Sequence, residues 1–331
     1  MIAFLAALAI AGPTAGDLKT FKDWVAGCDN GLVCQADGLL PVDDSVSATI
    51  AVKRGAEPDA IPEIWFRVDE GKPADIVADG RPLHLHLTAR DDGAEVAKAD
   101  SLRLASAITS AKSLSVVDSA GKAIAAISLN GSTAALLYMD DRQHRVGTTT
   151  ELVRKGAAPA SSIPAPPAVP VIAAAHRSSR PPVKLSAAEV RRIRGDEACD
   201  DPSQEGDVDY DRLDDRSTLA LVSEHCASGA YNFFYLPMIV GNDGKARAAV
   251  FEDSKPQSPD EDNGVFNAFW DAKARTLETG MKGRGLGDCG EWSTYAWDGT
   301  RFRLIELNVM SDCKGSIDFI TVWRAKAVER R

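Results

Sequence analysis

The chain has 331 residues, of which 44% are hydrophobic and 26% are charged, and its formal net charge is -10 at pH 7. This composition belongs to a globular protein long enough for about two domains, and it excludes a disordered chain. Sequence-independent binding to nucleic acid or anionic lipid requires clustered Lys and Arg, so the acidic balance predicts neutral or cationic partners and no nucleic acid.

Residues 1–16 have the pattern of a secretory signal peptide. The apolar run 2–11 is followed by small residues and a proline, which is typical of the hydrophobic and cleavage regions of such a signal, and we place cleavage near Ala15. The run departs from the pattern in that no Lys or Arg precedes it. No later stretch reaches about 18 apolar residues. We therefore predict a periplasmic or secreted protein without a membrane span.

Residues 17–155 are predicted to form an α+β domain that is rich in sheet. Apolar periodicity indicates strands at 47–54, 63–68 and 83–89, a helix at 101–112, a hairpin at 114–130 and a second helix from Ser132. His84 and His86 alternate with leucines in the third of these strands, so both imidazoles are expected on one face. No third ligand is visible nearby, and we interpret the two histidines as a polar outer face rather than a metal site.

Residues 156–185 are predicted to be an extended linker. They are dense in Pro, Ala and Ser and show no amphipathic period. Directly after them, Ser186 and Glu189 have the spacing of a capping box in which Glu189 reaches back to the Ser186 amide, and Gly195 can end the short helix that this box starts.

Residues 186–331 are predicted to form a mostly β domain. Four aspartates, each in a turn that leads into a strand, recur 27 to 29 residues apart, at Asp214, Asp243, Asp271 and Asp298. Two strands of about seven residues and their connections use that length, so each period indicates one hairpin. The four periods predict an antiparallel meander, closed into a barrel or folded into a sandwich, with all the aspartate turns at one end. The fold class expected for the whole chain is α+β, mainly β.

The cysteine pattern favours disulfides. The six cysteines are Cys28, Cys34, Cys199, Cys226, Cys289 and Cys313, and none forms a C-x-x-C motif, which fits an exported protein better than a zinc or redox site. Cys28 and Cys34 flank a turn and are predicted to pair. Cys226, Cys289 and Cys313 all fall in the connections opposite the aspartate turns. Cys289 and Cys313 flank one hairpin, so we pair them and leave Cys199 for Cys226.

The stretch KGRGLGDCGEW at 282–292 contains a formal GxGxxG. Binding of a phosphate by this motif requires a helix that starts at the last glycine, whereas residues 291–297 have the pattern of a hairpin strand. We therefore interpret the glycines as a tight turn held by a cysteine rather than as a nucleotide site. Lys282 and Arg284 are candidates for binding an anion at this rim, with solvated surface charge as the alternative.

A second candidate site is an acidic run whose spacing resembles the start of a calcium loop, formed by Asp207, Asp209, Asp211 and Asp215. Arg212 stands where such a loop needs glycine and Thr218 stands where it needs a bidentate Glu, so a solvated acidic loop is the alternative.

Catalytic motifs are scarce in the sequence. His225 adjoins Cys226, but a Cys-His pair requires a free cysteine and we expect this one to be bridged. The chain contains no GxSxG, HExxH or P-loop. The aromatic residues of the C-terminal domain, among them Trp292, Tyr295 and Trp297, are candidates for lining a ligand site, with a core role as the alternative.

Several stretches together resemble a six-cysteine bacterial exported family of unknown function (domain of unknown function eleven-seventy-six). They are FKDWVAGCDN, SLNGSTAALLYMDDRQHR, HCASGAYN, KGRGLGDCGEW with its WDG turn, and CKGSIDFITVWRA. The first half also resembles the invasion-associated locus B proteins, which are periplasmic or envelope-associated. These resemblances imply export and disulfides. They supply no activity and no catalytic residues to carry over, and we predict no cofactor.

From these patterns we expect a non-catalytic binding protein of the cell envelope whose partner is an envelope protein or a small ligand. One alternative is an envelope hydrolase that uses Asp and Glu, on a glycan type of substrate. The other is a calcium-stabilised adhesion or structural protein that uses the acidic run at 207–215.

Overall fold

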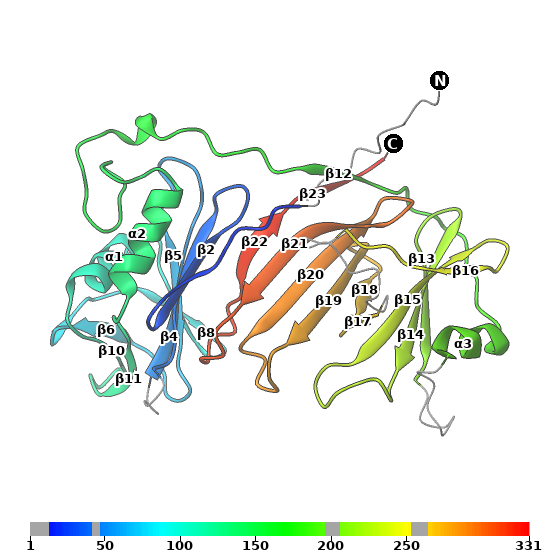
Figure 1. Cartoon of the computed structure of the whole chain (residues 1–331). Coiled ribbons are helices and arrows are strands. Elements are labelled where there is room, and N and C mark those ends of the chain that lie inside the picture. Colours follow the sequence, from blue (N-terminus) through cyan, green and yellow to red (C-terminus); the bar gives the residue numbers. More distant parts are fainter. Residues whose placement is uncertain (1–12, 42–46, 196–205, 253–263, 331) are drawn as a thin grey trace.

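The computed structural model describes residues 13–41, 47–195, 206–252 and 264–330. Within these ranges the chain is mainly β, with three α-helices and several antiparallel sheets, none of which closes into a barrel. The expected class, α+β and mainly β, is confirmed (Figure 1). The barrel that the sequence left open for the C-terminal domain is excluded for the described residues.

The N-terminal half is built on one sheet whose strands follow the order β1-β2-β3-β4-β11-β10-β6-β7, with β5 on β4, β9 on β5 and β8 on β9. All of these pairs are antiparallel except β4 with β11. The strands are β1 (Lys19–Phe21), β2 (Trp24–Cys28), β3 (Cys34–Gly38), β4 (Ser47–Arg54), β5 (Glu63–Arg67), β6 (Asp75–Ala78), β7 (Arg81–Pro82), β8 (Leu87–Arg90), β9 (Gly93–Val96), β10 (Leu114–Val117) and β11 (Ala123–Ile127).

Two helices, α1 (Ser101–Ser110) and α2 (Ser132–Arg142), pack together, and α2 also lies on strands β1 to β3. Helix α1 buries Leu104 and Ile108, which lie four positions apart on one face. Helix α2 begins after Gly131, whose φ of 104° lies in the left-handed region. A Cβ at this position would lie 1.7 Å from the Phe21 carbonyl oxygen, so only glycine allows α2 to approach β1.

One predicted strand is wrong in its first half. Strand β8 starts at Leu87, so residues 83–86 of the expected strand at 83–89 are not in a strand. The Asp75 carboxylate accepts the backbone N–H groups of His84 and Leu85 at 2.8 and 3.0 Å, which bends the chain here, and His84 has a φ of 52°. The two histidines therefore do not share the face of a strand. His86 instead places Nδ1 2.8 Å from the Asp100 carboxylate.

The linker is more structured than its composition indicates. It contains a 3-10 turn, η1 (Ala160–Ser162), and strand β12 (Val171–Ala174), which pairs in parallel with β23 (Lys326–Glu329) at the C-terminal end of the chain. Figure 1 shows the linker crossing the molecule from the α2 side to this strand pair. Pairing with β23 satisfies backbone groups that an isolated Pro-rich and Ala-rich segment would leave to water.

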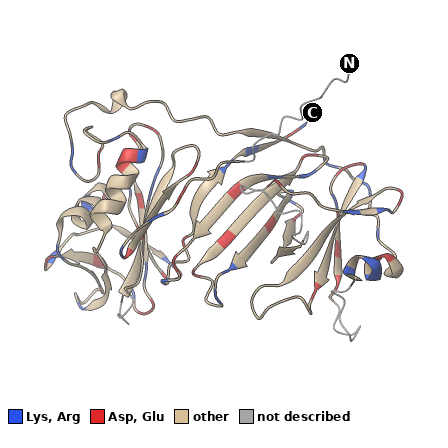
Figure 2. Cartoon of the chain, viewed as in Figure 1, with Lys and Arg blue, Asp and Glu red and all other residues tan. Residues whose placement is uncertain are grey.

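Helix α3 (Ala187–Arg194) follows the linker and starts as predicted, because the Ser186 hydroxyl accepts the Glu189 backbone N–H at 3.2 Å. The Glu189 carboxylate, however, binds Arg192 rather than the Ser186 amide, so only half of the expected capping box forms. Figure 2 shows a concentration of basic residues on this helix. One of them, Arg194, is buried and forms an ion pair with Glu224 at 2.7 Å.

The C-terminal half holds two antiparallel sheets, each with its strands in chain order. The first is β13 (Val208–Arg212), β14 (Ser217–Glu224), β15 (Phe234–Gly241) and β16 (Ala246–Ala248), with β17 (Val265–Phe266) on β15. The second is β18 (Phe269–Asp271), β19 (Thr276–Lys282), β20 (Gly290–Trp297), β21 (Phe302–Met310) and β22 (Ile320–Arg324). The expected meander is therefore present, but it is divided between two sheets.

The four periodic aspartates all form hairpin turns. The Oδ1 atom of each accepts at least one backbone N–H from the residues that follow it, at distances of 2.7 to 3.1 Å. The turns also contact one another, because Trp297 donates its indole N–H to Asp214 at 2.6 Å and Arg275 donates to the Leu213 carbonyl oxygen at 2.6 Å. We call this region the aspartate-turn end of the C-terminal half.

Two hydrophobic cores meet at strand β2. Because neighbouring strand residues point to opposite faces, Trp24 and Ala26 belong to the N-terminal core while Val25 belongs to the core of the C-terminal half. Leu39 joins Val25 in that second core, together with Val322 of β22. The two halves of the chain are thus packed against each other through apolar side chains.

A polar seam accompanies this contact. Arg67 binds Asp318 with two hydrogen bonds of 2.8 and 2.7 Å, and the side-chain amide of Gln35 donates to the fully buried Asp37 at 3.0 Å and to the Asp318 carbonyl oxygen at 3.1 Å. Burial, followed by the charge of Asp318, raises the pKa of Asp37 well above its usual range.

Two of the three predicted disulfides lie within the described residues. Cys28–Cys34 and Cys289–Cys313 are confirmed. Cys226 is also disulfide-bonded, and Cys199, its expected partner, lies outside the described residues. Disulfides persist outside the reducing cytosol, so the bridges indicate an extracytoplasmic protein. No helix in the described ranges is long and apolar enough to cross a membrane.

Candidate functional site

The GxGxxG stretch forms the turn between β19 and β20. Strand β20 starts at Gly290, where the phosphate-binding motif would need a helix, and Gly290 itself has a φ of 138°. The Gly283 N–H donates to the Cys289 carbonyl oxygen at 2.8 Å and closes the turn beside the disulfide. The stretch is therefore a disulfide-held hairpin turn rather than a phosphate cradle.

The two cations predicted at this rim are not equivalent. Arg284 is committed to Asp288, since its Nε lies 2.7 Å from Oδ1, and this hydrogen bond raises the pKa of Arg284 and lowers that of Asp288. Asp288 also accepts the Gly315 N–H at 2.7 Å, which ties the turn to the neighbouring connection. Lys282 is anchored through its backbone, which exchanges two hydrogen bonds with the Asn232 side chain.

The structure separates the three candidate aromatics. Tyr295 and Trp297 are buried in the C-terminal core, where Tyr295 packs edge-on against Phe251 and the Trp297 ring contacts Phe302. Trp292 lies three positions before Tyr295 in β20 and is paired with Gly280 of β19. A Cβ on Gly280 would lie 2.2 Å from the Trp292 ring, so the ring covers this glycine. These aromatics do not form one binding surface.

The acidic run is a strand rather than a loop. Asp209 and Asp211 lie in β13, paired with Leu221 and Leu219 of β14, and burial followed by the charge of Asp209 raises the pKa of Asp211. Asp215 lies in the next turn, where the Ser178 hydroxyl donates to it at 2.6 Å, and Asp207 precedes the strand. Across the described ranges no three His, Cys, Asp or Glu residues lie where they could hold a metal ion. His225 is exposed beside a bridged cysteine.

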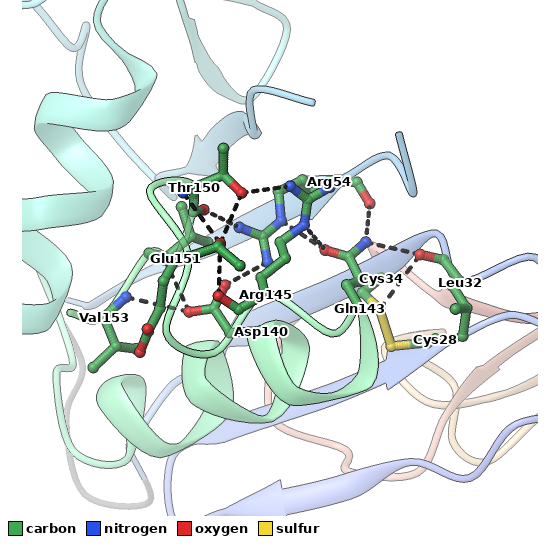
Figure 3. Close-up of polar contacts among 12 residues, drawn as sticks. Cys28, Leu32, Cys34, Arg54, Asp140, Gln143, Arg145, Thr150, Glu151 and Val153 are labelled. Carbon is green, nitrogen blue, oxygen red and sulfur yellow. Dashed lines mark hydrogen bonds and ion pairs between the residues drawn. A yellow bond between two sulfur atoms is a disulfide. The ribbon is translucent and has the colours of Figure 1, made fainter. Parts of the chain in front are cut away.

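Figure 3 shows a buried polar network that no sequence motif indicated as such. Arg54 forms an ion pair with Asp140 at 2.6 Å, and the Gln143 side-chain oxygen Oε1 accepts from Arg54 Nε at 2.7 Å and from Arg145 Nε at 3.1 Å. These four residues, Arg54, Asp140, Gln143 and Arg145, are each at most 1% exposed. Because no solvent or ligand reaches these groups, we assign the network to the stability of the N-terminal half.

The network joins segments that are distant in sequence. Gln143 donates to the Leu32 carbonyl oxygen at 2.7 Å beside the Cys28–Cys34 disulfide, and Asp140 accepts the backbone N–H groups of Leu152 and Val153 at 2.9 and 3.2 Å (Figure 3). The carboxylate therefore holds the segment that leads into the linker against the core.

The candidate ligand site with the clearest charge is a basic pocket at the aspartate-turn end. It is a cavity of about 330 Å³ under the β12–β23 pair, and its lining includes Arg177, Lys273, Arg275 and Glu329, with Trp297 as part of the wall. Three cations face one carboxylate in a protein whose net charge is -10. Its size lies near the lower end of the range of about 300 to 1,000 Å³ for small-molecule sites.

Hydrogen bonds hold the two arginines of the basic pocket in place. Arg275 donates to the Ala175 and Leu213 carbonyl oxygens at 2.8 and 2.6 Å, and Arg177 donates to the Ala272 carbonyl oxygen at 2.7 Å. Burial lowers the pKa of Arg275, although the charge of Glu329 opposes the effect. Glu329 accepts the Arg177 backbone N–H at 2.7 Å, and this bond, with the nearby cations, lowers its pKa.

Sequence reasoning named Trp297 of this pocket but missed its charged residues. The basic residues are visible as HRSSR at 176–180 and DAKAR at 271–275, but these stretches are about a hundred residues apart in the chain, as the 100-residue separation of the Arg275 to Ala175 bond shows. Their proximity depends on the parallel β12–β23 pair, for which the sequence carries no local signal.

Comparison with known proteins agrees with the motif-based assignment. A family model described as "Protein of unknown function (DUF1176)" matches residues 18–326. The uncharacterized protein YpfG of Escherichia coli (strain K12) is 30% identical over 322 residues, which cover 89% of this chain and 88% of that protein. No solved structure gives a significant match. The comparisons do not confirm the likeness of the first half to the invasion-associated locus B proteins. The chain belongs to the DUF1176 family.

Proposed function

We propose that the protein is an exported, non-catalytic binding protein of the cell envelope and that the basic pocket holds a small anion, such as a phosphate or carboxylate group. The observation that carries the proposal is the excess of three cations over one carboxylate in the lining. The signal-like residues 1–16 and the disulfides support export.

The affinity of the pocket for an anion depends on the charges that line it, more than on the net charge of the protein. Charges farther apart than a Debye length of about 8 Å are largely screened at physiological salt. The distant acidic groups therefore have little effect on a bound anion, although they slow its approach. Arg177, Lys273 and Arg275 lie in the lining and stabilise the anion once it is bound. The partly occupied guanidinium groups retain N–H donors for this contact, because each makes only one or two of its five possible hydrogen bonds.

The hydrolase alternative has no support in this pocket. A glycosidase of the usual kind needs two carboxyl groups across the scissile bond, and the lining holds one carboxylate, Glu329, which already accepts a backbone N–H and lies 3.6 Å from Arg275. For the calcium alternative, melting with and without a chelator is the direct test, and an unchanged melting temperature eliminates it.

The proposal is tested by calorimetric titration of the purified, oxidised protein with inorganic phosphate and with succinate at low salt. We expect saturable binding that weakens as NaCl is added. Replacing Arg177 and Lys273 together by Gln should weaken binding about ten-fold or more, because a hydrogen bond to a charged group is worth about 1.5 to 3 kcal/mol.

Two single variants make the test specific. Glu329→Gln removes the competing carboxylate and should tighten binding, an effect opposite in sign to that of the basic substitutions. Lys282→Gln removes a cation outside the pocket and should leave affinity unchanged. If the wild-type protein binds neither anion, or if Lys282→Gln abolishes binding and the pocket variants do not, the proposal fails.

A further inference from the structure

Strand β23, next to the C-terminal end of the chain in Figure 1, has one open edge. Within the described residues β23 pairs only with β12, and all four of its residues are exposed. The N–H groups of Lys326 and Arg330 donate to the β12 segment at 2.8 and 2.9 Å. Because neighbouring residues of a strand direct their backbone groups to opposite sides, Ala327 and Glu329 direct theirs away from β12.

An open edge of this kind is a place where another extended chain can pair. Natural proteins block such edges with proline, a bulge or charged side chains. Strand β23 contains no proline and its register with β12 is regular, so the charges of Lys326 and Glu329 are the devices that remain. Charged side chains repel some partners and attract others, and they therefore make the edge selective rather than closed.

One face of β23 belongs to the basic pocket. Ala327 and Glu329 line the pocket, as does Ala174, the residue of β12 that is paired with Glu329. A residue added opposite Ala327 would project to the same face, with its Cβ about 5 Å from that of Ala327. The side chain of an Asp or Glu at this position is directed toward the pocket and its cations.

The charges around the edge favour an acidic partner. Lys326 and Arg330 lie in or directly after β23, and Glu329 is the one acidic residue of the stretch 324–330. The Glu329 carboxylate is already engaged, because it accepts the Arg177 backbone N–H at 2.7 Å. The residue of a partner that faces Glu329 should be neutral or basic, since like charges opposite each other destabilise a sheet.

We propose that an extended acidic segment of a protein partner adds to the open edge of β23 as a third strand, with a carboxylate opposite Ala327 in the basic pocket. The inference rests on the proposed function, because it identifies the anion of that pocket as an Asp or Glu side chain of an extended peptide. Hydrogen bonds to the backbone of Ala327 and Glu329 supply affinity, and the pocket supplies the preference for an acidic residue.

The test is calorimetric titration of the purified, oxidised full chain with capped peptides. The probe is acetylated and amidated Thr-Ser-Thr-Glu-Thr-Ser-Thr, whose only charge is the central carboxylate, and the reference ligands are inorganic phosphate and acetylated, amidated Glu. We expect the heptapeptide to bind about ten-fold or more tightly than the single capped Glu, because it adds main-chain hydrogen bonds. A heptapeptide with Gln in place of Glu should bind about ten-fold or more weakly than the probe.

Two methylated forms of the probe test the strand pairing without any change in the protein. One carries a methyl group on the backbone nitrogen of the central Glu, and the other carries it on that of the Thr that follows. Neighbouring N–H groups of a strand point to opposite sides, so only one of the two faces β23. We expect one form to bind about ten-fold or more weakly than the other. Equal affinities of the two forms overturn the proposal.

A pair of variants tests the edge from the side of the protein. Ala327→Pro removes the N–H that faces the partner, whereas Ala327→Ser keeps it and serves as the matched control. The Pro variant should bind the heptapeptide about ten-fold more weakly than the Ser variant, because it loses one hydrogen bond and its ring obstructs the edge. The two variants should differ far less in their affinity for phosphate.

The reference ligands separate this inference from the proposed function. If phosphate binds but the heptapeptide binds no more tightly than the capped Glu, the edge does not bind peptides and this inference alone fails. If none of the three ligands binds, the proposed function fails as well. If sedimentation shows a wild-type dimer that Ala327→Pro dissociates, and the heptapeptide does not bind, the edge pairs with a second copy of the chain and the inference is overturned.

Discussion

Replacing Asp140 by Asn should strongly destabilise the N-terminal half. The Asp140 carboxylate is the only acidic group in the network of Figure 3 that forms an ion pair with Arg54, and its other oxygen accepts two backbone N–H groups. Burial, followed by the charge of Arg54, lowers the pKa of Arg145 to about 10, although the charge of Asp140 opposes the effect. Asp140→Asn leaves two buried guanidinium groups without a carboxylate.

The expected loss follows from the burial of all partners. Removing one member of a buried ion pair costs about 3 to 5 kcal/mol, which is a large part of the total stability of about 5 to 15 kcal/mol that is usual for proteins. With a urea m-value of about 3 kcal/mol/M, the unfolding midpoint should fall by about 1 to 1.7 M. Trp24 is fully buried and donates its indole N–H to the Ser128 carbonyl oxygen at 2.8 Å, so its fluorescence reports on this half.

The matched control is Asp141→Asn, which removes a carboxylate from the adjacent, exposed position of the same helix. Surface substitutions of this kind usually change stability by no more than about 0.5 kcal/mol. Both variants are measured under non-reducing conditions so that the disulfides stay intact. If Asp140→Asn costs no more than Asp141→Asn, the assignment of the network to stability is refuted.

Two further predictions concern pH and the disulfides. The native pKa of Asp37 is raised, so the folded state favours its protonated form and the wild type should lose stability as pH rises above about 4, the pKa of an unfolded Asp. Asp37→Asn should therefore have a higher melting temperature than the wild type at pH 7 and nearly the same melting temperature at pH 4. A difference in melting temperature that does not vary with pH would contradict this prediction. Replacing Cys289 and Cys313 by Ala should cost more than replacing Cys28 and Cys34, because their sequence separations are 24 and 6 residues and chain entropy then predicts losses of about 3.4 and about 2.2 kcal/mol. Equal urea midpoints for the two double variants would argue against an entropic origin.

The candidate site illustrates where prediction from sequence stopped. Lys282 and Arg284 are candidates for anion binding by their position beside a glycine motif, yet Arg284 forms a hydrogen bond with Asp288 within its own turn. Of the residues that line the basic pocket, Trp297 belongs to the WDG turn, whereas Arg177 and Glu329 belong to none of the motifs. Arg177 and Arg275 become neighbours because the linker strand β12 returns to the C-terminal strand β23, and a pairing between such distant segments leaves no periodic trace in either.

Local chemistry was enough to predict the strand at 47–54, the aspartate turns and the pairing of Cys289 with Cys313, because each of these depends on residues within one hairpin or less. Long-range packing settled the rest. It divided the meander into two sheets, bent the chain at His84 against Asp75, and gathered Arg54, Asp140 and Arg145 into one closed network. Such contacts form only when separate segments compete for the same buried space, and no single segment encodes the outcome of that competition.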